Sequence, residues 1–204
     1  MATLIQDRET ERRLIARRRR LGQDKFDEVW DGVYVMAPAP NIEHQNFVSG
    51  LNSLLFQVIE AAGQGMVLPG TNVSDRRVGW KKNYRVPDVA VFLNDTTAEH
   101  CGSYWFGGPD LAIEVASEEE HVTKKLAFYA TVQTRELLVV NRAPWSLELY
   151  RLTDGALNLV DRTTISSGIW LDSEVVPLAF RLIEGIERPR IEVRHSDGQQ
   201  TWMV

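Results

Sequence analysis

The clearest helical pattern in the chain lies between residues 43 and 62. Apolar side chains recur there every three or four positions, which is the spacing of one buried helix face, and Gly63 is typical of a helix end. Residues 119–133 carry a second, shorter pattern of the same kind. Residues 3–21 predict a helix that is polar almost all round, so we expect it to lie at the periphery of the molecule.

Around these helices the pattern changes to short apolar runs of strand length, separated by glycine-rich and charged turns. The turn at Asp154-Gly155 predicts a hairpin between the last two long runs. The predicted strands are 33–36, 65–70, 71–75, 84–93, 110–117, 136–141, 146–152 and 156–162, followed by two short tail candidates and an apolar segment around residues 178–183. A strand, helix, strand order in a β-rich chain predicts an α/β or α+β domain with a mixed sheet.

Length and charge divide the chain into an arm and a body. At 204 residues, we expect an arginine-rich helical arm over residues 1–24 and a single domain over residues 25–204. Residues 1–20 hold seven arginines and three acids, whereas the whole chain has a net charge of -5. A basic arm on an acidic body is suited to contact nucleic acid or an acidic neighbour. The alternative is a solvated helix that serves as a dimer arm.

The chain carries no sign of an oxidising compartment or a membrane. Its one cysteine, Cys101, excludes an intrachain disulfide framework and a multi-cysteine zinc site. No apolar run approaches the length of about 18 residues that spans a bilayer. We therefore expect a cytoplasmic protein without a membrane partner.

Two acids interrupt otherwise apolar strands. Alternation along residues 84–93 and 110–117 places Asp88 and Glu114 each beside small alanines on one strand face. Buried carboxylates that converge repel each other unless a cation lies between them, and oxygen ligands favour Mg²⁺ or Mn²⁺. The alternative is an acid at a strand end paired with Arg85 or another surface arginine.

The helix predicted after Glu114 supplies a cation. At 100° per residue, Lys125 lies on the shoulder of the apolar stripe and Lys124 lies opposite the stripe. Lys125 can therefore reach back over the sheet edge, and Lys124 should point to solvent. The alternative for Lys125 is an ordinary surface lysine with a partly buried stem.

The order and spacing of several segments resemble the Uma-two family of putative restriction endonucleases, over about residues 26–152. The segments are RVPDVAVF, GGPDLAIEVAS, KLAFYA, RELLVVN and LELYRL, preceded by DEVWDGVYVMAPAPNIEHQNFVSGLNSLL. The resemblance implies a PD-(D/E)XK nuclease-like fold. The expected fold is a restriction-endonuclease-like core, with a mixed central β-sheet flanked by helices and extra β-hairpins.

The resemblance also implies roles for individual residues. Asp88 matches the acid of the PD element and Glu114 the acid of the E-x-K element, so both would ligate Mg²⁺, with the Val115 carbonyl as a possible third ligand. Lys125 matches a lysine that such proteins carry in the following helix. Glu28 matches an acid that the fold often places in its first element.

These residues predict a metal-dependent endonuclease that hydrolyses phosphodiester bonds in DNA and, as the family resemblance also implies, self-associates as a homodimer. The alternative is a catalytically inactive nuclease-fold module that binds a partner or nucleic acid. Ala116, His121 and the acidic run at residues 118–120 favour this alternative, because the general nuclease pattern has a lysine two residues after Glu114 and the acidic run would repel phosphate.

Four other residues have two interpretations each. His44 begins the long helix, where a histidine satisfied by its local structure is favoured over an active-site role. Trp80, Trp105 and Trp145 lie in loop-like stretches and could stack on bases, although ordinary packing is the favoured interpretation.

Overall fold

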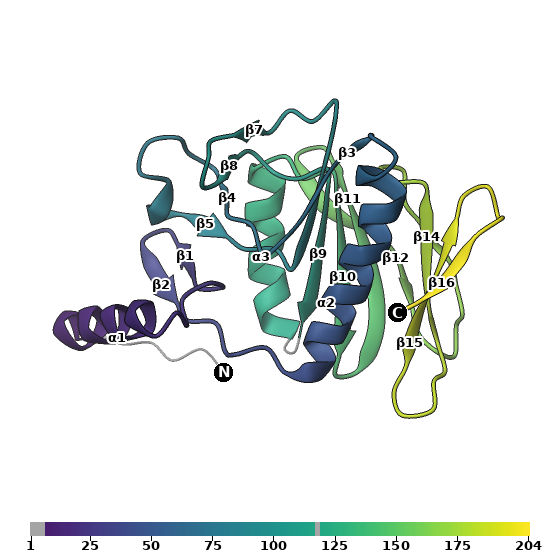
Figure 1. Ribbon diagram of the computed structural model, residues 1–204, viewed down its shortest axis with the longest axis horizontal. Helices are drawn as coiled ribbons and strands as arrows, with labels where there is room; N and C mark the ends of the chain where they lie inside the picture. Colours follow the sequence, from purple (N-terminus) through teal and green to yellow (C-terminus); the bar gives the residue numbers. More distant parts are fainter. Residues whose placement is uncertain (1–6, 117–118) are drawn as a thin grey trace.

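The computed structural model describes residues 7–116 and 119–204, which form three α-helices and three β-sheets in an α+β arrangement (Figure 1). The helices are α1 (Arg8–Arg20), α2 (Ile42–Leu55) and α3 (Glu119–Thr131), and α2 continues into a π-helical turn over Phe56–Glu60. No helix in this described part of the chain is long and apolar enough to cross a membrane.

The central sheet has six strands in the order β12-β11-β10-β9-β6-β3 among the described residues. β9 and β10 are parallel and are joined through α3, whereas the other neighbours pair antiparallel. The expected mixed sheet is confirmed, because parallel and antiparallel pairs occur in it together. The parallel pair requires a crossover connection, which α3 provides. The strands are β3 (Gly65–Pro69), β6 (Val89–Leu93), β9 (Leu111–Ala116), β10 (Glu136–Arg142), β11 (Trp145–Thr153) and β12 (Ala156–Thr163).

The two faces of the central sheet carry different helices. Val89 and Val91 of β6 belong to the hydrophobic cluster that contains the buried residues of α2. Ala90 and Phe92, which alternate with them, belong to the cluster that contains the buried residues of α3. The sheet is therefore buried between α2 and α3, as expected for a strand whose side chains alternate between two covered faces.

A second sheet lies on the α3 side and has the order β2-β1-β5-β4-β8-β7. Val73 and Trp105 join it to the α3-side cluster, and the Trp105 ring stacks on Phe92 with centroids 3.8 Å apart. Its strands are β1 (Glu28–Trp30), β2 (Val33–Val35), β4 (Val73–Ser74), β5 (Tyr84–Arg85), β7 (Glu99–His100) and β8 (Trp105–Phe106).

The C-terminal segment forms a third sheet on the α2 side, seen at the yellow end of the chain in Figure 1. Phe180, Ile191 and Val193 belong to the same core cluster as α2. The apolar segment noted around residues 178–183 is thus a strand of a packed sheet. The strands are β13 (Leu171–Asp172), β14 (Leu178–Ile183), β15 (Arg190–His195) and β16 (Thr201–Met203).

The single strand predicted over residues 84–93 is wrong. The chain leaves the second sheet after β5, passes through residues 86–88, and enters the central sheet as β6. Pro87 has no N–H to donate to a ladder, and the Asp88 carboxylate instead accepts a hydrogen bond from the Val115 N–H at 2.7 Å. The break puts Asp88 at the junction of the two sheets.

Helix α1 is attached to the body through one buried carboxylate. The Arg18 guanidinium donates to both oxygens of Asp27, at 2.7 and 2.6 Å, and also to the carbonyl oxygens of Gln23 and Ala37. Asp27 accepts a further hydrogen bond from the Tyr34 hydroxyl at 2.7 Å. These contacts hold the C-terminal end of α1 against β2 and the following loop.

Candidate active site

Glu114 lies in β9, and Asp88 lies directly before β6, which is the antiparallel neighbour of β9 in the central sheet. β6 and β9 pair antiparallel as far as Val89 opposite Ile113, and beyond this pair the Asp88 carboxylate accepts the Val115 N–H of β9 at 2.7 Å. Glu114 contacts Lys125 and Tyr129 of α3, whereas Asp88 contacts His44 of α2, so the shared strand face of the two acids stays a prediction.

Glu114 is buried among groups that hold its carboxylate from several sides. Lys125 donates to its two oxygens at 3.0 and 2.9 Å, and the Tyr129 hydroxyl donates to Oε1 at 2.6 Å. Burial raises the pKa of Glu114 to about 7, and the negative charges of Asp88 and Glu28 act in the same direction. The carboxylate is therefore costly to ionise without a further positive charge.

Glu28 reaches the same cluster from β1. Its Oε1 lies 2.9 Å from the Lys125 ammonium and accepts the Val86 N–H at 2.9 Å, while Oε2 accepts from Trp30 Nε1 at 2.6 Å. Burial disfavours the charged form of Lys125, but Glu114 and Glu28 outweigh this effect and raise its pKa. Lys125 therefore stays an ammonium that bridges β1 and β9 from α3.

The two neighbouring lysines differ as the helical spacing predicted. The Lys125 side chain is only 15% exposed and points into the carboxylate cluster, whereas Lys124 is exposed. The sequence thus distinguished the buried lysine from its neighbour. The side chains of residues 117–123, including the acidic run at 118–120 and His121, lie outside the described part of the chain.

His44 belongs to the site, although the sequence favoured a histidine that is satisfied by its local structure. Its Nε2 lies 3.0 Å from Asp88 Oδ1, and its backbone N–H donates to Asn41 Oδ1 at 2.8 Å as part of the helix cap. A usable signal was present, because His44 shares a helical stripe with Val48 and Leu51, which face the central sheet. Tyr129 lies on the apolar stripe of the same helix as Lys125, and helical spacing alone does not indicate that its hydroxyl contacts Glu114.

The three tryptophans pack against other aromatic rings, which supports ordinary packing over base stacking. Trp105 is buried against Phe92. Trp80 stacks on Tyr104, with ring centroids 4.6 Å apart. The ring centroids of Trp145 and Phe47 are 5.6 Å apart. Arg85 donates to backbone and amide oxygens and lies over the rings of Trp30 and Phe128, and no ion pair to an acid is seen for it in the described chain.

Carboxylate oxygens suit a hard divalent cation, but those of Asp88, Glu114 and Glu28 do not form a single coordination shell in this structure. In the described residues, no group of three His, Cys, Asp or Glu side chains surrounds a common point. Asp88 is the most exposed of the three carboxylates, at 17% against 9% for Glu114 and 7% for Glu28. A cation from solvent would therefore meet Asp88 first.

A mixed sheet between two helices, with one acid in a strand, a second acid directly before the neighbouring strand and a lysine in the next helix, is the arrangement of a nuclease-like α+β protein. The chain belongs to the Uma2 family, described as putative restriction endonuclease, whose model matches residues 16–182. The resemblance seen in the sequence is confirmed.

Among solved structures, the chain is similar to a putative nuclease belonging to DUF820 from Anabaena variabilis ATCC 29413. The TM-score is 0.57 with 18% sequence identity, and the match covers 72% of this chain and 80% of the other. This likeness confirms the nuclease-like fold. No curated protein matches the chain.

Proposed function

We propose that the protein is a metal-dependent endonuclease that hydrolyses phosphodiester bonds in DNA. The observation that carries the proposal is that Glu28 and Glu114 meet on the Lys125 ammonium, while the Val115 N–H holds the Asp88 carboxylate beside the strand of Glu114. Three carboxylates with one lysine leave excess negative charge, and this excess favours a divalent cation. Membership of a nuclease family supports the reaction class.

Asp88 and Glu114 would hold Mg²⁺ or Mn²⁺, with the Val115 carbonyl as a third protein ligand. A divalent cation bound there supplies an activated water and stabilises negative charge on the scissile phosphate. Oxygen ligands match the preference of both ions. The Val115 N–H already orients Asp88 through its hydrogen bond, which fixes the carboxylate beside β9.

Lys125 and Glu28 act together in this proposal. With Glu114 as a ligand, Lys125 would no longer have to balance both of its oxygens, and its ammonium would be available to a phosphate oxygen. Glu28 keeps the ammonium in position through its contact at 2.9 Å. A fixed cation aimed at developing charge lowers the barrier because it needs no reorganisation during the reaction.

Two further proposals concern the state of the protein. We propose a homodimer, because Leu21 at the end of α1 is 52% exposed and Leu14 and Ile15 of the same helix are only half-buried. We also propose a cytoplasmic location, which the unpaired Cys101 supports because free thiols persist in reducing compartments.

The test is cleavage of plasmid and short linear DNA by the purified protein in Mg²⁺, Mn²⁺ or EDTA. We expect nicking that requires the metal and is lost in Asp88→Ala, while Asp95→Ala, which changes an exposed aspartate, keeps the parent activity. If the parent never exceeds Asp88→Ala with either metal, the alternative of an inactive nuclease-fold module that binds nucleic acid or a partner replaces this proposal.

A further inference from the structure

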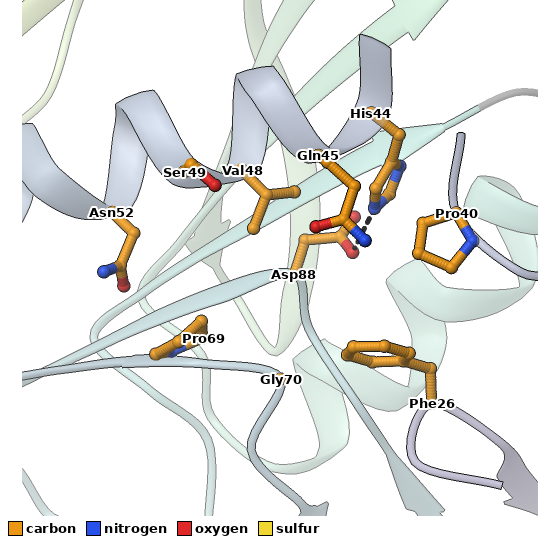
Figure 2. A pocket seen from close by; sticks show the side chains of 10 residues that line it. All are labelled: Phe26, Pro40, His44, Gln45, Val48, Ser49, Asn52, Pro69, Gly70 and Asp88. Carbon is orange, nitrogen blue, oxygen red and sulfur yellow. Dashed lines mark ion pairs between the residues drawn. The ribbon is translucent and has the colours of Figure 1, made fainter. Parts of the chain in front are cut away.

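A cleft of about 300 Å³ opens beside Asp88, between α2 and the end of β3 (Figure 2). Figure 2 shows His44 and Asp88 facing each other at one wall, with Asn52 near Pro69 at one end and Phe26 at the other. The cleft shares Asp88 and His44 with the candidate active site. A group bound in this cleft would therefore lie next to the reacting phosphate.

The cleft wall formed by α2 carries three polar side chains around the apolar Val48. Gln45, Ser49 and Asn52 are spaced so that they share one helix face, while Phe47 and Leu51 of the same helix are buried in the core. Asn52 Oδ1 is buried and has no hydrogen-bond partner among the described residues. A buried acceptor is normally paired, and rotation of the Asn52 side chain toward the cleft would bring this oxygen to a donor on a bound molecule.

The opposite end of the cleft offers an aromatic surface. The Phe26 side chain is 42% exposed, and its ring lies so close to Gly70 that a Cβ at Gly70 would be 2.8 Å from Phe26 Cε1. Gly70 has a φ of +60°, a conformation that favours glycine, so this close approach is built into the turn. The ring is thus held in place while part of it remains open to a ligand.

Volume and chemistry together favour one occupant. A cleft of about 300 Å³ is at the small end of ligand sites, which suits a single ring system and excludes a duplex. A pocket that combines an aromatic surface with hydrogen-bonding side chains is how proteins bind an unstacked base. We propose that the cleft receives the base of one unpaired nucleotide next to the scissile phosphate.

In this arrangement Phe26 stacks on the base, and Gln45, Ser49 and Asn52 bind its edge. The inference deepens the proposed function, on which the position of the scissile phosphate rests. It identifies the substrate class as nucleic acid that is single-stranded or from which one base is extruded. Binding of the base itself does not require cleavage, so the two ideas can be tested separately.

The binding test uses calorimetry in EDTA with the four deoxynucleoside monophosphates and deoxyribose 5-phosphate. We expect at least one nucleotide to bind about tenfold more tightly than the sugar phosphate, since stacking on an aromatic ring is worth this much. Phe26→Ala and Asn52→Ala should abolish the difference. Phe56→Ala and Asn46→Ala, exposed positions on α2 and its extension outside the cleft, should retain it.

Equal binding of the sugar phosphate and every nucleotide would overturn the inference, as would cleft variants that behave like their controls. Gln45→Ala guards against misfolding, because Gln45 is exposed and its removal leaves the core intact; it should also weaken base binding. Metal-dependent cleavage without base-dependent binding overturns the cleft and leaves the nuclease standing. Base-dependent binding without cleavage supports the cleft and counts against the nuclease.

Discussion

Lys125 is the residue on which the charge balance of the candidate site depends, because its ammonium contacts both Glu28 and Glu114. We expect Lys125→Ala to lower DNA cleavage by a factor of about 10² or more, since it removes a cation aimed at developing charge. The matched control is Lys124→Ala at the exposed neighbouring position, which should mainly weaken DNA binding at low salt. The measurement is the rate of DNA nicking by each variant. Equal activity of Lys125→Ala and the parent would contradict the role of Lys125 as the functional lysine.

Glu114 predicts a pH dependence of stability in the metal-free protein. Burial raises its pKa to about 7 from 4.5, so the folded state holds this proton more tightly than the unfolded chain. The resulting stabilisation is complete below the unfolded pKa and is lost as pH rises through the folded pKa. We expect the free energy of unfolding in EDTA to fall by up to about 3 kcal/mol between pH 5 and pH 8 from this group.

Urea unfolding at several pH values measures this effect. Glu114→Gln should flatten the curve, because it removes the titrating carboxyl and leaves Lys125 paired with Glu28. Glu187→Gln, at an exposed position, should keep the parent slope. The same slope in Glu114→Gln and the parent would show that the titrating group lies elsewhere.

At the scale of the elements, α1 is attached mainly through Arg18. The Asp27 carboxylate that it contacts is 1% exposed, so Arg18→Ala would leave a buried charge with the Tyr34 hydroxyl and the Ala37 N–H as remaining donors. Breaking a buried ion pair is destabilising, and the partial exposure of Arg18 reduces the effect here to about 2 kcal/mol. Urea unfolding should show this loss in Arg18→Ala and none in Arg12→Ala, at an exposed position on α1. Equal stability of both variants would mean that other contacts hold the arm.

The sequence predicted the elements whose pattern is local. The apolar spacing of α2 and α3 located both helices to within a few residues, and the apolar runs located the strands β6 and β9. The interruption at Pro87 was missed because the apolar pattern continues through it from one sheet into the next. The third sheet was only partly foreseen, since the strand pairing that defines it is not visible in any one segment.

The sequence predicted those site residues whose role can be recognised within a single helix or strand. Lys125 emerged from helical spacing, but the Tyr129 hydroxyl looked like part of an apolar stripe. The helical stripe of His44 indicates that it faces the sheet, but its partner Asp88 lies more than forty residues away in sequence, and no local pattern identifies that partner. The cleft was missed for the same reason, because the polar side chains of α2 line it together with Phe26 and Gly70, which belong to other segments of the chain.

At the scale of the whole molecule, one core cluster includes α2, the central sheet and the C-terminal sheet. The end of the chain returns to this core, since Val204 packs against Gly50 of α2, where a Cβ would lie 2.6 Å from Val204 Cγ1. We therefore expect residues 25–204 to behave as one domain, with the arm as the part available for other contacts. This expectation follows from the shared core, because a common cluster makes separate unfolding of its parts unfavourable.

The proposed homodimer is tested by light scattering at micromolar concentration. We expect twice the mass of one chain, and a shift toward the monomer in Leu21→Glu, because a charge at this exposed leucine would oppose burial in an interface. Leu159→Glu changes a leucine that is 51% exposed on β12 and should leave the mass unchanged. A parent protein that scatters as a monomer would contradict the dimer.

The central claim is that Asp88 and Glu114 hold a divalent cation, and anomalous diffraction from crystals soaked in Mn²⁺ tests it most directly. We predict one strong anomalous peak bonded to oxygens of both carboxylates, with the Val115 carbonyl within reach, and its loss in Asp88→Ala. Ligand distances of about 2.0–2.2 Å are expected for such an ion. The absence of a peak there, with Lys125 still paired to Glu28 and Glu114, would contradict the account.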